Sequence, residues 1–265
     1  MQLNGPLEKL KYSIENPIRY SLTMGEESLP LNELLGSTIE LRYTGHIRCF
    51  CGEIKDKIYR QNFCYNCFWT LPQAGASIFE PEKSTAHLGI ADRDLEFEQR
   101  YQLQPHTVYL SVTNGVKVGV TRSNARMYRW VDQGAVEAIV LAETENRHEA
   151  GLIEHFLKKH MPDKTNWRKM VSGETDMVNL LMEKEIAADR LSADLQKWLS
   201  PDQEIYQLHY PVLQYPRKVQ SLNIEKTPEY RGKLSGIKGQ YLLFEDGTVF
   251  NVRNHEGRIV ELRVA

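Results

Sequence analysis

All four cysteines of the chain fall within a short stretch, Cys49 to Cys67, and this cluster limits the fold more than any other feature. The spacing is Cys-x-Cys, then twelve residues, then Cys-x-x-Cys. Two tight turns joined by a hairpin would bring two thiols each to one point, and structural zinc sites use four such ligands. We therefore predict a structural zinc site formed by Cys49, Cys51, Cys64 and Cys67.

Two alternatives to this ligand set stay open. His46 lies three residues before Cys49 and could replace one thiolate, and the four thiols could instead be free cysteines in a core. A catalytic zinc needs an open coordination position, and four cysteines leave none. Clustered thiols in a reducing compartment favour metal binding over disulfides, so we expect a structural metal.

The composition is that of a globular protein, with 41% hydrophobic and 26% charged residues. No apolar run approaches the roughly 18 residues that cross a bilayer. The first twenty residues are polar and interrupted by Pro6 and Pro17, unlike a signal peptide. We expect a cytoplasmic protein with no membrane partner.

Positive charge gathers in two segments although the whole chain carries a net charge of −2. Residues 41–70 hold five basic and two acidic side chains, and residues 101–170 hold ten basic and seven acidic ones. Aromatic residues interleave with basic residues between positions 55 and 69, as they do where bases stack and phosphates are bound. This pattern favours DNA or RNA as the partner.

Local patterns predict an α+β protein in five parts. These are a β-rich head with zinc knuckles (1–70), a linker or arm (71–106), a central α/β domain (107–170), a helical connection (171–200) and a β-rich domain shaped as a small barrel (201–265). Proline and glycine punctuate the second part, which indicates irregular structure. Hairpin turns are expected at Asp246-Gly247 and Glu256-Gly257 in the last part.

The central part has the clearest pattern. Two β runs, 106–112 and 116–122, flank the hairpin signal Asn114-Gly115, and a helix closed by Gly134 follows. After a third strand at 136–144, residues 146–160 show helical spacing, with Asn146 as the expected cap. The order of elements is strand, strand, helix, strand, helix.

The segments "TVYL", "KVGVTR" and "AGLIEHFLKKHMPDKTN" resemble the GIY-YIG nuclease superfamily. That resemblance implies a three-stranded sheet with flanking helices and a site for phosphodiester cleavage. Tyr109 matches the tyrosine of GIY, and Lys117 stands where YIG has its own tyrosine. Glu154 matches the metal-binding glutamate and Asn166 the downstream asparagine. The implied ion at Glu154 is Mg²⁺ or Mn²⁺.

The catalytic arginine of that superfamily has two candidates here, Arg126 and Arg129, which lie three residues apart on the expected helix. We prefer Arg129 because the surrounding "RWVDQGA" is part of a second, longer resemblance. Together with "NRHEAGLIE", "DKTNW" and "GIKGQYL", it is similar to an uncharacterised bacterial family of unassigned function.

That second resemblance implies further cysteines between residues 75 and 105, forming another metal site. At those positions this chain has other residues, so we do not expect a second site, and only His87 is left there as a candidate ligand. The substituted positions are Ala74, Ser77, Ser84 and Ala86.

Three functional hypotheses follow. The first is a zinc-containing nucleic-acid-binding protein that is also a candidate metal-dependent endonuclease. The second is a non-catalytic, zinc-stabilised interaction module that binds another protein through its C-terminal β domain. The third is a small-molecule site in the central part. Arginine and a metal-bound carboxylate suit phosphoryl transfer, whereas Lys117 in place of the second tyrosine argues against strong catalysis.

Overall fold

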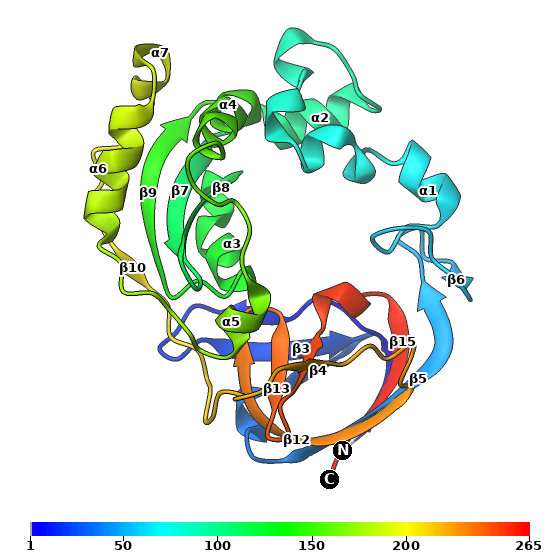
Figure 1. Ribbon diagram of the computed structural model, residues 1–265. Helices are drawn as coiled ribbons and strands as arrows, with labels where there is room; N and C mark the ends of the chain where they lie inside the picture. The colour runs from blue at the N-terminus through cyan, green and yellow to red at the C-terminus, as the bar shows by residue number, and fades with distance from the viewer. Residues whose placement is uncertain (1) are drawn as a thin grey trace. The chain divides into compact units, whose positions relative to one another are not determined.

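The structure is a computed structural model that describes residues 2–265, and it divides into two compact units. Unit 1 comprises Met1–Trp69, Trp167–Glu174 and Leu208–Ala265, and unit 2 comprises Thr70–Asn166 and Thr175–Gln207. Each unit combines antiparallel strands with helices, which confirms the α+β class (Figure 1). None of the helices in residues 2–265 has both the length and the apolar character of a membrane span.

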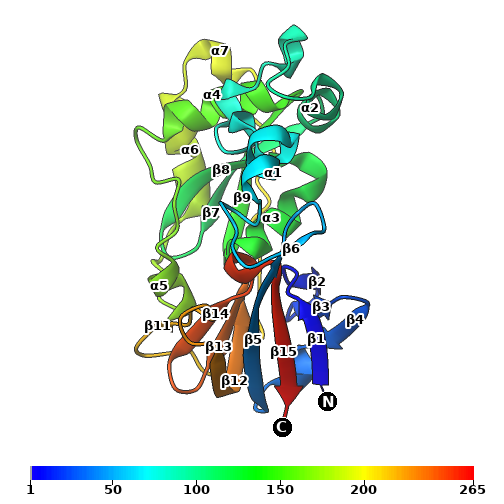
Figure 2. The ribbon, with the colours of Figure 1, turned by 90° about the vertical axis from the view of Figure 1, so that its right-hand side faces the viewer.

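An eight-stranded sheet forms the centre of unit 1, in the order β1-β15-β5-β12-β13-β14-β11, with β6 paired to β5 (Figure 2). Along β5 the buried Ile39 and Leu41 alternate with the more exposed Glu40 and Arg42, because successive side chains of a strand point to opposite faces. The strands are β1 (Gln2–Pro6), β5 (Thr38–Arg48), β6 (Ile54–Lys55), β11 (Gln220–Ser221), β12 (Glu229–Lys238), β13 (Tyr241–Phe244), β14 (Thr248–Asn251) and β15 (Arg258–Val264).

This sheet differs from the expected separation of residues 1–70 and 201–265. β5 pairs with β15 on one side and with β12 on the other, so both segments share one sheet. Asp246-Gly247 does close the hairpin between β13 and β14. Glu256-Gly257 closes no hairpin, because β15 leaves β14 and pairs with β1 and β5 instead. Pairings across such sequence distances leave no local pattern.

The rest of unit 1 packs around this sheet. A second, three-stranded sheet has the order β2-β3-β4. Helix α1 starts in unit 1 and ends on the first residue of unit 2. The remaining elements are β2 (Lys11–Ser13), β3 (Arg19–Met24), β4 (Glu27–Pro30), α1 (Tyr65–Thr70), α5 (Trp167–Val171) and the 3₁₀ turns η1 (Asn32–Leu34) and η7 (Arg253–His255).

Unit 2 is built on a four-stranded antiparallel sheet in the order β10-β9-β7-β8. Its apolar core lies between this sheet and helices α4 and α6, and Figure 1 shows α6 running beside β9. The elements are β7 (His106–Val112), β8 (Val116–Arg122), η6 (Ser123–Ala125), α3 (Arg126–Asp132), β9 (Glu137–Thr144), α4 (Arg147–Leu157), α6 (Leu180–Arg190), α7 (Ala193–Gln196) and β10 (Tyr206–Gln207).

Residues 71–106 are more ordered than a linker. Pro72 and Pro81 each stand at the start of a 3₁₀ turn, where the missing N–H costs nothing. The buried Glu98 carboxylate accepts hydrogen bonds from three consecutive backbone N–H groups, those of residues 92–94. The elements are η2 (Pro72–Ala74), η3 (Ala76–Ile78), η4 (Pro81–Lys83), η5 (Ala86–Leu88) and α2 (Leu95–Gln102).

Candidate metal centre and catalytic cluster

The four cysteines of unit 1 come together in space. Their sulfur atoms all lie within 4.8 Å of one another, and none is in a disulfide. A tetrahedron with Zn–S bonds near 2.3 Å has edges of about 3.8 Å, so a small closure of this cluster would accommodate the ion. Cys49 and Cys67 are buried, whereas Cys51 is exposed. The donor set therefore fits a metal such as zinc.

Local hydrogen bonds shape the two turns that carry these ligands. The N–H of Gly52 donates to the carbonyl of Cys49 at 2.8 Å, and Gly52 has a φ of +92°, which favours glycine. The N–H of Cys64 donates to the sulfur of Cys49 at 3.1 Å, which ties the second turn to the first. A thiolate is a better acceptor than a thiol, so this bond suits a metal-bound Cys49.

Crowding among the sulfurs changes the chemistry of Cys67. Burial, followed by hydrogen bonds to the thiols of Cys64, Cys51 and Cys49, raises the pKa of Cys67 to about 12. Four thiolates without a cation would repel one another at this separation, and a bound cation removes that cost. The arrangement is thus electrostatically suited to a divalent ion.

The two histidines considered as ligands lie elsewhere. His46 is paired through Nδ1 with Asp56 at 3.2 Å, and it is not part of the four-sulfur group. His87, in unit 2, stacks on His148 with a centroid distance of 4.3 Å. In the segment around His87, the side chains of Ser77, Ser84 and Gln102 form a buried hydrogen-bonded group.

In unit 2, Tyr109 lies at the centre of the sheet and is fully buried. It pairs with Gly119 across β7 and β8, and its ring covers that glycine. A Cβ atom at residue 119 would lie 2.6 Å from the Tyr109 hydroxyl oxygen, so only glycine fits beneath the ring. The glycine of "KVG" therefore positions the tyrosine of "TVY".

Arg129 on α3 and Gln133, the C-cap of that helix, both act on the Tyr109 phenol. The hydroxyl donates to Oε1 of Gln133 at 3.0 Å, and the positive charge of Arg129 acts on it electrostatically. Burial raises the pKa of Tyr109, while Arg129 and Gln133 oppose that rise. Gln133 was not predicted, although it lies four residues after Arg129 and hence on the same helix face.

Lys117 is buried on the neighbouring strand, opposite Ser111. Burial and the nearby positive charge of Arg129 lower the pKa of Lys117 to about 7, against the opposing effects of Asp163 and Glu154. Its ammonium group has no ion pair within 4 Å among residues 2–265. At neutral pH a substantial fraction of Lys117 is therefore an uncharged amine, which can accept a proton.

Glu154 projects from α4 toward the same group of charges. Its carboxylate is paired with Lys158 at 3.3 Å, and Lys158 also lies 3.7 Å from the carboxylate of Asp163. Burial raises the pKa of Glu154, while Lys158 and Arg147 lower it. The ammonium group of Lys158 thus lies near two carboxylates, an arrangement that attracts a cation.

The two other residues proposed from the sequence lie outside this group. Arg126 pairs with Glu143 at 3.4 Å, and its guanidinium lies over the ring of Tyr206. Asn166 is exposed, and its backbone N–H donates to the side chain of Asn114 in the turn between β7 and β8. Of the two arginine candidates, Arg129 is the one that contacts Tyr109.

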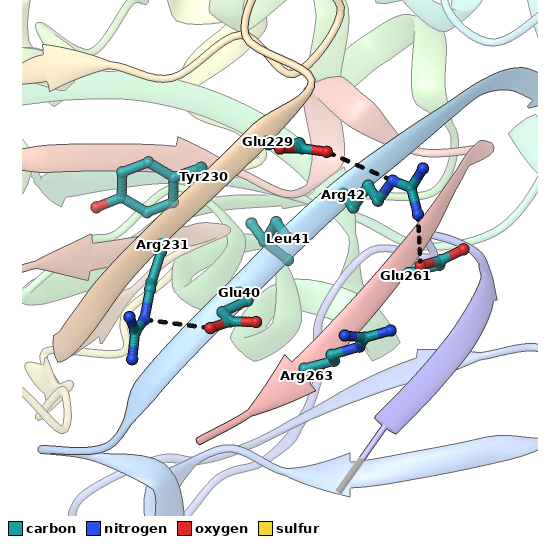
Figure 3. A pocket seen from close by; sticks show the side chains of 8 residues that line it. All are labelled: Glu40, Leu41, Arg42, Glu229, Tyr230, Arg231, Glu261 and Arg263. Atoms are coloured by element: carbon teal, nitrogen blue, oxygen red, sulfur yellow. Dashed lines mark ion pairs between the residues drawn. The ribbon is translucent and has the colours of Figure 1, made fainter.

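A cavity of about 440 Å³ in unit 1 lies over the outer face of β5, β12 and β15 (Figure 3). Alternating charges line it, and most of them are paired with each other. Arg42 bridges Glu229 and Glu261, and Arg231 pairs with Glu40 at 3.1 Å. Because these charges neutralise one another, the cavity shows no preference for a charged ligand.

Comparison with known proteins gives one match. A family described as "Protein of unknown function (DUF2797)" matches residues 36–260, which includes the four cysteines and the cluster around Tyr109. No curated protein and no solved structure matches the chain.

Proposed function

The chain belongs to the DUF2797 family, and we propose that it is a zinc-stabilised nucleic-acid-binding protein whose unit 2 cleaves phosphodiester bonds with the help of a divalent ion. One observation carries the proposal. Tyr109, Lys117, Arg129 and Glu154 come from two strands and two helices, yet each acts electrostatically on others of the group. Such a cluster of perturbed groups is typical of active sites.

Zinc fits the cysteine cluster and has a structural role in this proposal. Four thiolates fill the coordination shell and leave no position for a substrate. The ion would fix the turns at Cys49–Cys51 and Cys64–Cys67, which have few buried apolar neighbours to hold them. The catalytic ion is a separate one.

Glu154 would hold that second ion, Mg²⁺ or Mn²⁺. Asp163 would be a second ligand, because Lys158 pairs with both carboxylates. Such ions bind one or two carboxylates and keep several waters. When bound, the ion supplies a Lewis acid for a phosphoryl oxygen. If the ion took the place of the Lys158 ammonium group, the carboxylates of Glu154 and Asp163 could both bind the ion.

Three side chains have separate roles in the remaining steps. Arg129 donates to the phosphoryl oxygens, on which negative charge builds up in the transition state. The uncharged amine of Lys117 accepts the proton of the attacking water, while the phosphorus–oxygen bond to the leaving group breaks. Burial raises the pKa of Tyr109, which makes its phenolate a rare species at neutral pH, so its role is to hold Arg129 in position.

A second candidate function has its own support. Tyr109 is fully buried and Lys117 is only 4% exposed, which suits a cluster without substrate access. In that case the protein would be a zinc-stabilised module that binds another protein. Both functions predict the same metal, so zinc content does not separate them.

Nicking of labelled DNA and RNA with added Mg²⁺ or Mn²⁺ separates them. Glu154→Gln should abolish cleavage while keeping nucleic-acid binding, because it removes a metal ligand and a negative charge. Arg129→Ala should slow cleavage by about a hundred- to thousandfold, as expected when one transition-state donor is lost.

Arg126→Ala is the matched control, because Arg126 lies one helical turn away and pairs with Glu143 instead. It should leave cleavage nearly unchanged. Cleavage that survives Glu154→Gln would come from another site or a contaminant, and the assignment would be withdrawn. Absence of cleavage in the parent would favour the binding module.

A further inference from the structure

Aromatic rings beside the cysteine cluster are exposed to an unusual degree. Tyr65 is 62% exposed, Trp69 53% and Tyr59 42%. With Phe68 they form a connected group, which we call the aromatic face, with ring centroids 5.2 to 6.4 Å apart. Exposed apolar area of this kind commonly marks a binding surface.

The metal turns hold these rings in place. Tyr65, Phe68 and Trp69 follow one another at helical spacing on α1, and the ligands Cys64 and Cys67 are interleaved with them. Tyr59 is held from the preceding turn by one backbone hydrogen bond, from its N–H to the carbonyl of Phe63 at 2.9 Å. The rings are therefore already held in place, so binding of a ligand would cost little conformational entropy of these side chains.

One cation lies against the aromatic face. The guanidinium of Arg60 lies 5.6 Å from the ring centre of Tyr59 and 5.8 Å from that of Phe68. Within residues 2–265, Arg60 has no ion pair. The nearest acidic residues in sequence, Glu53 and Asp56, are already paired with Lys55 and His46. The border of the face is thus positively charged.

We propose that the aromatic face binds single-stranded nucleic acid. Unpaired bases would stack on Tyr65 and Trp69, and a phosphate would contact Arg60. A duplex keeps its bases stacked on each other and offers the rings little, and an apolar protein partner would gain nothing from the positive charge of Arg60. The inference takes from the proposed function only that the ligand is a nucleic acid. It does not require that unit 2 cleaves that ligand.

The test is fluorescence anisotropy with labelled oligothymidine, oligoadenosine and a matched duplex, using the full-length, metal-loaded protein with Glu154→Gln as background. Single strands should bind more tightly than the duplex. Tyr65→Ala and Trp69→Ala should each weaken single-strand binding by about 5- to 150-fold, the cost typical of one lost stacking contact.

Three further variants make the test specific. Trp69→Phe should restore most of the binding, because it keeps a ring. Phe79→Ala removes an aromatic side chain of similar exposure, 51%, from unit 2, which does not contribute to the aromatic face, and should have no effect. Arg60→Gln should reduce the slope of log affinity against log salt by about 0.7, whereas the ring variants should leave that slope unchanged.

Thermal unfolding and metal content of each variant show whether the knuckle is still folded. Single-strand binding that is indifferent to both ring variants overturns the inference, as does no binding at low salt or equal binding of the duplex. These outcomes are separate from the proposed cleavage: loss of ring dependence leaves the nicking result intact, and failed nicking leaves the strand binding intact.

Discussion

At the scale of single residues, the proposed chemistry of unit 2 depends most on Lys117. A lysine is almost always charged, yet here burial and the nearby charge of Arg129 lower its pKa to about 7. In the GIY-YIG motif considered from the sequence, this position is a tyrosine. A phenol and a neutral amine can both accept a hydrogen bond from water, so either group could serve in the proposed proton transfer.

The pH dependence of the free energy of unfolding should reveal the lowered pKa of Lys117. Its pKa is about 7 when folded and near 10.5 when unfolded. Between pH 7 and pH 10.5 the Lys117 side chain is protonated in the unfolded chain and unprotonated in the folded chain. The loss of folding stability that comes from burying a charged Lys117 is therefore complete below pH 7, and it disappears as the pH rises toward 10.5. Lys117→Met should therefore raise the free energy of unfolding by a few kcal/mol at pH 6.5 and by little at pH 10.

Urea unfolding at the two pH values measures this difference. Lys159→Met is the control, because Lys159 lies on an exposed part of the same unit and should show no pH-dependent gain. An equal gain for Lys117→Met at both pH values would mean that Lys117 is charged when folded.

Among the elements, α4 connects the candidate site with residues 71–106. Arg147 at its start donates to the carbonyls of Ser77 and Ile78, both at 2.9 Å. Gly151 lies against the backbone of Pro81 and Glu82, so closely that no side chain fits between them. The helix that carries Glu154 thus also holds the 3₁₀ turns in place.

Gly151→Ala tests this contact. In an open helix the change would stabilise by about 0.5–1 kcal/mol. Here the added methyl group would clash with backbone, and we expect a loss of about 1–3 kcal/mol together with faster proteolysis between residues 71 and 95. Gly115→Ala is the control, since its nearest atom belongs to the flexible side chain of Asp176. Unchanged proteolysis would show that the turns do not depend on α4.

The elements that could be predicted from the sequence are those with local determinants. Asn146 caps α4 through a hydrogen bond to the N–H of Glu149, and Asn114-Gly115 lies in the turn between β7 and β8, as expected. The arm at 71–106 was less predictable, because its order depends on contacts with α4, which lies much later in the sequence.

Some residues of the candidate sites could also be predicted from the sequence, and others could not. The four cysteines lie close in sequence, so their spacing alone predicted that they meet. Tyr109, Arg129 and Glu154 were expected through a resemblance, and the structure brings them near one another. Gln133 and Asp163 were missed because a glutamine or an aspartate has no distinctive pattern until its neighbours are known.

For the whole molecule, the division into two units predicts a local effect of metal removal. All four cysteines belong to unit 1. A chelator, or Cys64→Ser, should therefore destabilise unit 1, by an amount on the order of 10 kcal/mol for a fully formed site, and leave unit 2 folded. Hydrogen exchange read by mass spectrometry can follow both units in one sample.

Peptides from residues 38–67 should lose protection after metal removal, while those from β7, β8 and β9 should keep it. Protein prepared without added metal should contain one zinc ion per chain. Folded protein without zinc and with four reduced thiols would contradict the structural role. Equal loss of protection in both units would show that they unfold together.

The pairing of β5 with β12 and β15 also sets an order of events during translation. β5 ends at Arg48, whereas its two neighbours begin at Glu229 and Arg258. At 5–20 residues per second, a ribosome takes roughly 10–40 seconds to supply them. During that delay the nascent β5 has two unpaired edges, and the whole of unit 2 emerges. Ligands as close in sequence as Cys49 and Cys67 can capture a metal meanwhile, which would shield four reactive thiols before the sheet that supports them exists.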